Sequence, residues 1–346
     1  MDDGVCHLAS IVGTHLREWE PTRPFVELAI FGSDDPLIIA RAIEAFCLDQ
    51  LGARVARGLF YQSSIGSVAG VALADGRRVV IKTHQPERPV AFLAEIVRVQ
   101  RHLADSGVFA ADVIAGPSPL GHGHAVVESF IDIGVTEDAH RPEIRAALAA
   151  GLRTIITTCA PLVGSSTLER GLLARPDAPL WPTPHSKLFD FEATASGAEW
   201  IDEVASLARQ RMAPAGVRVI GHGDWRAEHV RFLGDKPVAA FDWDSLCCQL
   251  EPELLGTVAH GFCADWSRSD RRQAPTMQEA RAFSGDYEKA RGSAFSASER
   301  RLLGASFAYA CAYTARCGHS LGGEARDEAG TFQHLVWTEG ANLLEL

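Results

Sequence analysis

The chain has 346 residues, of which 47% are hydrophobic, and this length exceeds the usual size of one core, so we expect two lobes or domains. No apolar run reaches the length of a transmembrane helix, and the acidic start lacks the profile of a secretory signal, which predicts a cytoplasmic protein. A net charge of −11 argues against binding to nucleic acid or to anionic membranes and is compatible with a cationic substrate. The eight cysteines form no Cys-x-x-Cys pair, so we expect reduced, buried thiols and no zinc site.

The first 83 residues change from helical to strand patterns. Residues 1–35 contain an amphipathic helix over 7–19 and a short apolar run over 25–31, to which we assign no chemistry. Asp35 and Pro36 predict the start of a helix over 37–51, and strands follow over 57–83 with a hairpin at Asp75-Gly76. The loop over 62–67, with Ser64 and Gly66, suits backbone binding of phosphates, although a plain turn explains it equally well.

Lys82 ends a buried apolar strand over 79–82. An unpaired charge in such a place is costly, so we expect a carboxylate or a phosphate as its partner; the alternative is a lysine that emerges into solvent. A helix is predicted over 89–103, and Glu95 lies inside it among apolar neighbours. A strand lysine followed by a helix glutamate matches the ion pair that orients the phosphate-binding lysine of kinases.

Two more strands and a series of helices complete the pattern. Strands over 108–114 and 125–130, separated by a Gly/Pro/His loop over 116–124, bring the predicted sheet to five strands. Helices are predicted over 142–158 and 200–212, with a proline-rich connector over 176–184 between them. Further helices are predicted over 254–266, 277–291, 296–315 and 332–344, with a charged loop over 266–275 and a capping box from Ser296 to Glu299.

The stretch over 219–255 carries the strongest signal. Two short apolar strands, over 230–233 and 238–241, are joined by the turn-forming run Gly234-Asp235-Lys236-Pro237. A His222-Gly223-Asp224 run precedes this hairpin and Asp242 follows it, so the hairpin brings both aspartates to one end. Either run alone is usually a turn or a solvated strand end. Two carboxylates brought together in this way suit proton abstraction and divalent-metal binding, which are the two needs of phosphoryl transfer.

These residues resemble the catalytic core of the aminoglycoside phosphotransferase-like small-molecule kinases, which share the protein-kinase fold. The pattern of that family is His-Gly-Asp-x-x-x-x-Asn, a short hairpin and then an apolar residue followed by Asp. The resemblance implies an α+β fold with an N-terminal nucleotide-binding lobe over 36–130, built on an antiparallel five-stranded sheet. A mainly helical C-terminal lobe over 131–346 would hold the catalytic loop over 218–246 and the acceptor site. The implied reaction is ATP-dependent phosphorylation of a small-molecule hydroxyl.

The same resemblance assigns roles to individual residues. Asp224 matches the catalytic base, Asp242 matches the Mg²⁺-holding aspartate, and Lys82 would neutralise the nucleotide phosphates. Asp244 either adds a metal contact or caps the following helix. Backbone groups flanked by Glu128 and Phe130 would bind adenine, and His222 would brace the loop rather than transfer protons. Arg226 would contact phosphate, pair with Glu228 or remain solvated.

His229 stands where the family has its metal-binding asparagine. An imidazole nitrogen is a softer ligand than the amide oxygen that Mg²⁺ prefers. Three outcomes are therefore open: His229 binds the metal, a neighbour such as Asp244 replaces it, or catalysis is weak.

Two other classes of protein remain as alternatives. One is a metal-dependent hydrolase that uses a cluster of His222, Asp224, His229, Asp242 and Asp244, which leaves Lys82 and Glu95 without a role. The other is a catalytically silent kinase-like binding module. Among acceptors, an aminoglycoside, another amino sugar or an amino alcohol fits the acidic composition. The candidate acidic contacts are Glu251, Glu253, Asp265 and Asp270.

Overall fold

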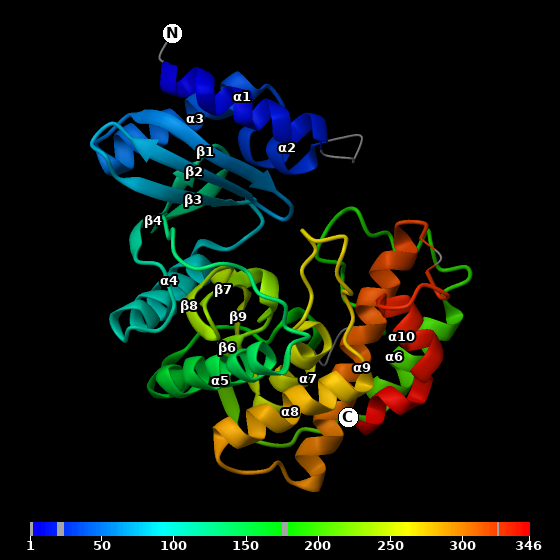
Figure 1. Ribbon diagram of the computed structural model, residues 1–346. Helices are drawn as coiled ribbons and strands as arrows, with labels where there is room; N and C mark the ends of the chain where they lie inside the picture. Colours follow the sequence, from blue (N-terminus) through cyan, green and yellow to red (C-terminus); the bar gives the residue numbers. More distant parts are fainter. Residues whose placement is uncertain (1–2, 19–23, 175–178, 324) are drawn as a thin grey trace. The chain divides into compact units, whose positions relative to one another are not determined.

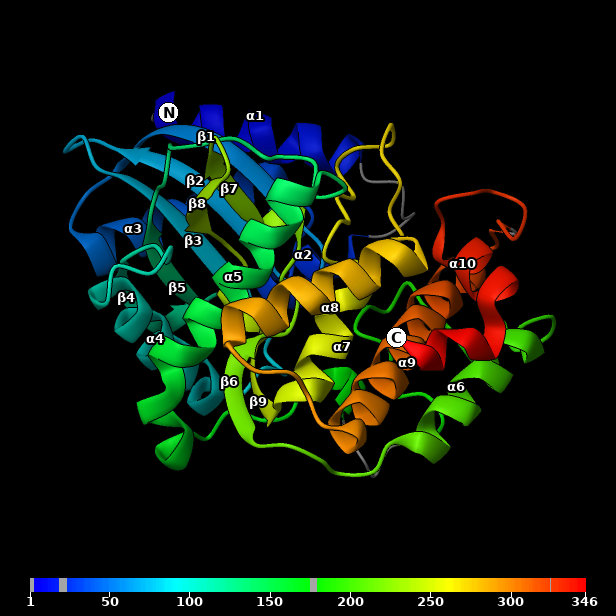
Figure 2. The same cartoon turned by 60° about the horizontal axis from the view of Figure 1, so that its bottom comes forward.

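The computed structural model describes residues 3–18, 24–174, 179–323 and 325–346. The chain forms two compact units, which are drawn in Figures 1 and 2. Unit 1 comprises Met1–Ala104 and Ala110–Asp132, and unit 2 comprises Asp105–Phe109 and Ile133–Leu346.

Unit 1 contains the antiparallel five-stranded sheet that the sequence predicts, in the order β1-β2-β3-β5-β4. Its strands are β1 (Val55–Ser63), β2 (Ser67–Leu73), β3 (Arg78–His84), β4 (Val113–Leu120) and β5 (Gly123–Ser129). The predicted Asp-Gly hairpin joins β2 to β3, and Gly76 there has the positive φ of 90° that favours glycine. Because side chains alternate across a strand, Ile81 and Val127 point into one core while Lys82 and Glu128 point to the opposite face.

Four helices accompany this sheet: α1 (Asp3–Glu18), α2 (Phe25–Phe31), α3 (Pro36–Leu51) and α4 (Val90–Asp105). Figure 1 shows α1 and α3 on one side of the sheet, where they share its hydrophobic core. Asp35 caps α3 as expected, since its side chain accepts a hydrogen bond of 2.8 Å from the amide of Leu37. The backbones of α1 and β1 are so close that a Cβ at Gly4 would lie 1.9 Å from the carbonyl oxygen of Val55. The N-terminal segment is therefore part of the core of unit 1.

The predicted position of the fourth strand is wrong. The sequence pattern placed it over 108–114 with a loop over 116–124, whereas β4 starts at Val113 and continues to Leu120 through a cis peptide bond before Pro117. The turn is at Gly121-His122. Proline has no amide proton for the ladder, which suggests a loop, but β4 is an edge strand, where proline is tolerated.

Unit 2 is mainly helical, with two small antiparallel ladders. The first pairs β6 (Arg218–His222) with β9 (Leu246–Leu250), and the second is the predicted hairpin of β7 (Val230–Leu233) and β8 (Lys236–Ala240). The helices are α5 (Pro142–Cys159), α6 (Glu199–Arg211), α7 (Glu251–Gly261), α8 (Met277–Arg291), α9 (Ala297–Ser320) and α10 (Phe332–Glu339). Five 3₁₀ turns are described: Ala160–Ser165, Leu172–Ala174, Ala227–His229, Trp243–Ser245 and Gly340–Glu345. Figure 2 shows α6, α7 and α10 next to α9, while α8 packs against α5 and α7.

Most helices of unit 2 agree with the sequence pattern. The capping box of Ser296 and Glu299 is present at α9. α7 starts earlier than the helix predicted over 254–266, because Pro252 fits the first turn of a helix. It also ends earlier, at Gly261. Of the predicted connector over 176–184, residues 176–178 lie outside the described part of the chain. All eight cysteines are free, and all except Cys6 are buried.

One segment departs from the expectation that no apolar run has the length of a membrane span. By length and composition, Pro142–Ser165 is apolar enough to cross a membrane. α5, which forms most of this segment, buries apolar side chains such as Ile144, Leu148 and Leu152 and packs against α8 and β6. This packing is that of a core helix within unit 2.

Candidate active site

The β7–β8 hairpin of unit 2 places Asp224, His229 and Asp242 at one end. The chain leaves β6 at His222, passes Asp224 and the 3₁₀ turn that ends at His229, and enters β7; β8 then leads back to Asp242. The amide of Phe241 donates a hydrogen bond of 2.9 Å to the carbonyl oxygen of His229, which fixes the two ends side by side. One ligand atom each from Asp224, His229 and Asp242 lie within 4.8 Å of one another.

His222 braces this site. Its imidazole is fully buried, edge-on between the rings of Trp225 and Trp243. Nε2 donates to the carbonyl oxygen of Phe241 at 2.9 Å, and Nδ1 accepts from the amide of Asp224 at 3.2 Å. Burial lowers the pKa of His222 to about 4, so the ring is neutral. Because both nitrogens are engaged, His222 has no lone pair for a metal, which argues against its role in the hydrolase cluster.

Asp242 has an unusual backbone. Its φ is 62°, in the left-handed region that non-glycine residues seldom adopt. The conformation is held by its surroundings, because Ser245 Oγ donates to Asp242 Oδ2 at 2.9 Å and the buried indole of Trp243 donates to the carbonyl oxygen of Ala240 at 2.9 Å. Backbone strain that the neighbouring contacts maintain is typical of functional sites.

Asp224 is clamped by an arginine. Nη1 of Arg226 lies 2.5 Å from each carboxylate oxygen of Asp224, and its Nε donates to Glu228 at 3.0 Å. Burial acts to raise the pKa of Asp224, but the charge of Arg226 is the largest of the effects that outweigh it and lower the pKa. Asp224 is therefore an ionised carboxylate at neutral pH, as a proton acceptor must be.

The cluster fits a divalent cation. Two carboxylates and one imidazole are common ligands of such ions, and their spacing is short enough for one ion to bridge them. Among the described residues, Asp244 is not in this cluster; it lies in the 3₁₀ turn Trp243–Ser245.

In unit 1, Lys82 pairs with a residue for which the sequence predicted another role. Its Nζ lies 3.6 Å from Oε1 of Glu128, and both side chains are mostly buried. Glu95 accepts two hydrogen bonds from Arg98, and its predicted pairing with Lys82 stays a prediction. The sequence feature that could have indicated this pairing is that Glu128 is a lone carboxylate in an apolar strand. The structure pairs this strand with the strand of Lys82.

The remaining nucleotide-site candidates are held by the sheet. The amide of Ser64 donates to the carbonyl oxygen of Gly66 at 3.0 Å and closes the turn between β1 and β2. A Cβ at Gly66 would lie 2.6 Å from the carbonyl oxygen of Thr83, so the turn requires glycine. The amide of Phe130 donates to the carbonyl oxygen of Arg78 at 3.2 Å, so it is engaged within unit 1.

The four acidic residues that were candidates for binding a cation all have arginine partners. Glu251 contacts Arg153 at 3.1 Å and Arg291 at 3.2 Å, Glu253 contacts Arg170 at 2.5 Å, Asp265 contacts Arg271 at 3.6 Å, and Asp270 contacts Arg268 at 2.8 Å. Three of the four carboxylates are almost fully buried, Asp270 being the exception. Their negative charge is therefore compensated within the protein.

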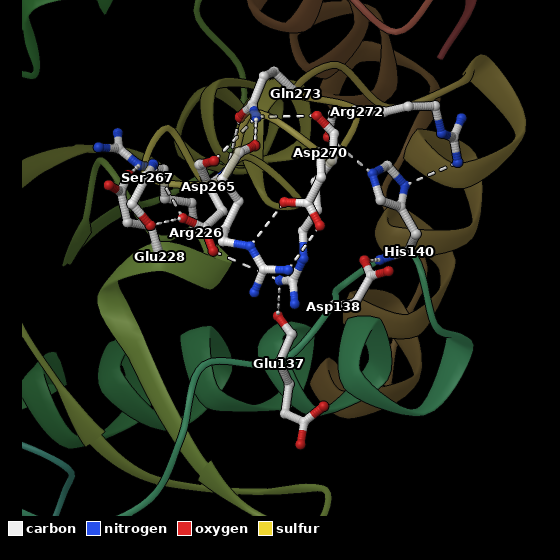
Figure 3. A network of polar contacts seen from close by, with 12 residues as sticks. Glu137, Asp138, His140, Arg226, Glu228, Asp265, Ser267, Asp270, Arg272 and Gln273 are labelled. Atoms are coloured by element: carbon white, nitrogen blue, oxygen red, sulfur yellow. Dashed lines mark hydrogen bonds and ion pairs between the residues drawn. The ribbon is translucent and has the colours of Figure 1, made fainter.

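The loop that follows α7 lies beside the catalytic loop (Figure 3). The amides of Ala227 and Glu228 donate to the carbonyl oxygens of Phe262 and Ala264, at 2.9 and 3.4 Å. Gln273 fixes the loop, because its Nε2 donates to three backbone carbonyl oxygens, including that of Asp265. Sequence reasoning treated this stretch as a charged loop with Asp265 and Asp270 as candidate acceptor contacts, and did not predict that it lies beside the catalytic loop.

Comparison with known proteins agrees with this geometry. The model of the phosphotransferase enzyme family matches residues 70–292, which is more than half of the chain. The chain belongs to this family. It is thus a small-molecule phosphotransferase that acts on a hydroxyl group, and the predicted resemblance is confirmed. No curated protein matches the sequence.

Solved structures of other phosphotransferases have the same fold. An amicoumacin kinase in complex with AMP-PNP, Ca²⁺ and Ami is 12% identical with a TM-score of 0.56, and the match covers 83% of this chain and 88% of that kinase. A spectinomycin phosphotransferase in complex with ADP and spectinomycin is 13% identical with a TM-score of 0.53, covering 88% and 96%. A macrolide 2'-phosphotransferase from Brachybacterium faecium is 14% identical with a TM-score of 0.51, covering 88% and 97%. The predicted protein-kinase-like α+β fold is confirmed.

Proposed function

We propose that this phosphotransferase moves the γ-phosphoryl group of ATP to a hydroxyl of a small molecule, with Asp224 as the proton acceptor. The observation that supports this most is the convergence of Asp224, His229 and Asp242 at the end of the β7–β8 hairpin. Nucleotides in the amicoumacin and spectinomycin kinases support ATP as the phosphoryl donor.

Asp224 has the hydrogen-bonding capacity that this role requires. An ionised carboxylate has about four lone-pair sites, and Arg226 occupies only one on each oxygen. The remaining sites can accept the proton of the substrate hydroxyl as its oxygen bonds to the γ-phosphorus and the bond from phosphorus to ADP breaks. Arg226 keeps the carboxylate oriented, and Lys82 neutralises phosphate charge. A divalent cation, bound by Asp242 and its neighbours, would neutralise further charge on the transferring group.

The contacts in unit 2 reduce the number of acceptor classes that fit the proposed function. Since each acidic candidate already has an arginine partner, little uncompensated negative charge is available to a polycation. The segment that contacts the catalytic loop instead presents an exposed aromatic ring: Trp266 is 52% exposed, and its ring lies 6.1 Å from the buried ring of Phe332. Within the predicted substrates, an amino sugar or amino alcohol with one amine and an apolar face fits better than a polycationic aminoglycoside.

The first test is thermal unfolding of the wild type and of Asp242→Ala with AMP-PNP and a divalent cation. A ligand at about a hundred times its dissociation constant stabilises the native state by about 2.7 kcal/mol, which raises the Tm by several degrees. We expect a metal-dependent rise in the wild type that Asp242→Ala loses and that Asp235→Ala, in the exposed hairpin turn, retains. A rise that needs no metal would contradict the proposed role of Asp242.

A second test follows ADP release with a panel of amino sugars and amino alcohols. Asp224→Asn should still bind AMP-PNP, though more weakly where the carboxylate contacts the cation, and should lose the acceptor-dependent reaction by about 10²–10⁴-fold at saturating nucleotide. An Asp224→Asn enzyme as active as the wild type would refute the assignment of the base. Nucleotide binding without turnover on any acceptor in the wild type would favour the silent module.

A further inference from the structure

The site at the end of the hairpin contains a nitrogen ligand where the family pattern has an amide oxygen. His229 is the residue concerned, and its imidazole is mostly buried, with 14% of the side chain exposed. It lies in the same cluster as the carboxylates of Asp224 and Asp242. The identity of the cation therefore depends on which ions accept a mixed set of nitrogen and oxygen ligands.

The hydrogen bonding of His229 determines its tautomer. Nδ1 lies 2.9 Å from the backbone carbonyl oxygen of Asp224. A carbonyl oxygen only accepts hydrogen bonds, so Nδ1 carries a proton and donates it. In the neutral ring the free lone pair is then on Nε2. Such a hydrogen bond to a backbone carbonyl is the usual support of a metal-binding histidine, because it fixes the ring and makes the other nitrogen a better ligand.

Three further contacts restrict His229. The backbone of His229 is held at both sides, since its amide donates to the carbonyl oxygen of Arg226 at 3.0 Å and its carbonyl oxygen accepts from the amide of Phe241 at 2.9 Å. The ring packs against that of His222, with centroids 6.2 Å apart. Nδ1 also lies 3.8 Å from Oδ2 of Asp224, and a rotation of the ring would break its bond to the Asp224 carbonyl oxygen. The imidazole is therefore held next to the carboxylates, and Nε2 is the ring nitrogen that keeps a lone pair for an ion.

Magnesium is poorly matched to such a ligand set. It requires oxygen ligands in nearly ideal octahedral geometry, whereas first-row transition-metal ions bind imidazole nitrogen together with carboxylate oxygen. We propose that His229 makes this site selective for a divalent first-row transition-metal ion over Mg²⁺. The inference rests on the proposed function for the position of the site, but metal preference can be measured without phosphoryl transfer.

Manganese is the most demanding probe, because Mn²⁺ is the weakest binder of the first-row series. The protein is titrated with Mn²⁺ in the presence of AMP-PNP, and the free Mn²⁺ is followed by electron paramagnetic resonance. The bound Mn²⁺ is then displaced with Mg²⁺. The matched control is His229→Asn, which replaces the imidazole with an amide that offers an oxygen. We expect the ratio of Mn²⁺ to Mg²⁺ affinity to be at least tenfold larger in the wild type than in His229→Asn.

A spectroscopic readout separates ligation from an indirect effect. Bound Mn²⁺ with an imidazole ligand shows coupling to the ring nitrogen in pulsed electron paramagnetic resonance, and this signal should be present in the wild type and absent from His229→Asn. Equal affinity ratios, or no nitrogen coupling in the wild type, would overturn the proposal while leaving nucleotide binding intact. Loss of nucleotide binding with every cation would instead count against the proposed function. Circular dichroism of His229→Asn and of His229→Gln shows whether each variant is folded.

Discussion

The buried neutral His222 makes the stability of unit 2 depend on pH. Its pKa in the folded protein is about 4, against 6.5 for the free side chain, so the unfolded chain binds the proton more readily. Acidification therefore stabilises the unfolded state, and the loss of stability begins as the pH falls below 6.5 and is complete near pH 4. At pH 5 this single group should lower the free energy of unfolding by about 2 kcal/mol relative to neutral pH.

The informative substitution is His222→Gln. Glutamine can still donate to the carbonyl oxygen of Phe241 through Nε2, but it does not titrate and cannot accept from the amide of Asp224 as Nδ1 does. At pH 7 we expect His222→Gln to lower the free energy of unfolding by about 1–3 kcal/mol, because the buried amide of Asp224 is left without its acceptor. Between pH 7 and pH 5, however, the variant should lose about 2 kcal/mol less than the wild type.

Urea unfolding followed by tryptophan fluorescence suits this measurement, since Trp225 and Trp243 contact the His222 ring. The wild type, His222→Gln and a control are compared at pH 7 and pH 5. The control is His319→Gln, whose imidazole lies in an exposed contact with the carbonyl oxygen of Ser196. Carboxylates also titrate in this range, so the difference between the variants carries the information. If His222→Gln and the wild type lost the same stability on acidification, the reasoning from burial would be refuted.

Three further predictions concern packing and charge. Gly256→Ala should lower the free energy of unfolding by about 1–3 kcal/mol, because its Cβ would lie 2.3 Å from a backbone oxygen of α9. Gly285→Ala, with open space at its Cβ, should instead raise the free energy of unfolding by about 0.4–1 kcal/mol. Urea unfolding measures both changes. Arg226→Gln removes the charge that lowers the pKa of Asp224, so the acid limb of the pH–rate profile should move to higher pH, and an unmoved limb would exclude this role. Glu251→Gln leaves two arginines without their buried counter-charge and should cost about 3–5 kcal/mol in the same unfolding assay, while a neutral effect would show that water compensates them.

Local signals determined much of the fold and of the candidate site. The turn-forming run over 234–237 indicated the β7–β8 hairpin, although only Gly234 and Asp235 form the turn and Lys236 and Pro237 already belong to β8. The helix caps at Asp35 and Ser296 marked where α3 and α9 begin. These features depend on neighbours within a few positions along the chain. For the same reason the position of Asp224 and Asp242 relative to the hairpin was predictable, and with it their proximity.

Tertiary structure decided what surrounds those residues. The sequence alone did not reveal that His222 is buried between two tryptophans or that Glu128 is one partner of Lys82. It predicted Glu251 and Glu253 as contacts for a cationic acceptor, whereas arginines from distant segments compensate both. Burial and charge pairing join residues that are tens of positions apart, and a carboxylate that faces solvent has the same sequence pattern as one that faces an arginine. Composition therefore predicted an acidic protein, and only the fold showed where that acidity is already neutralised.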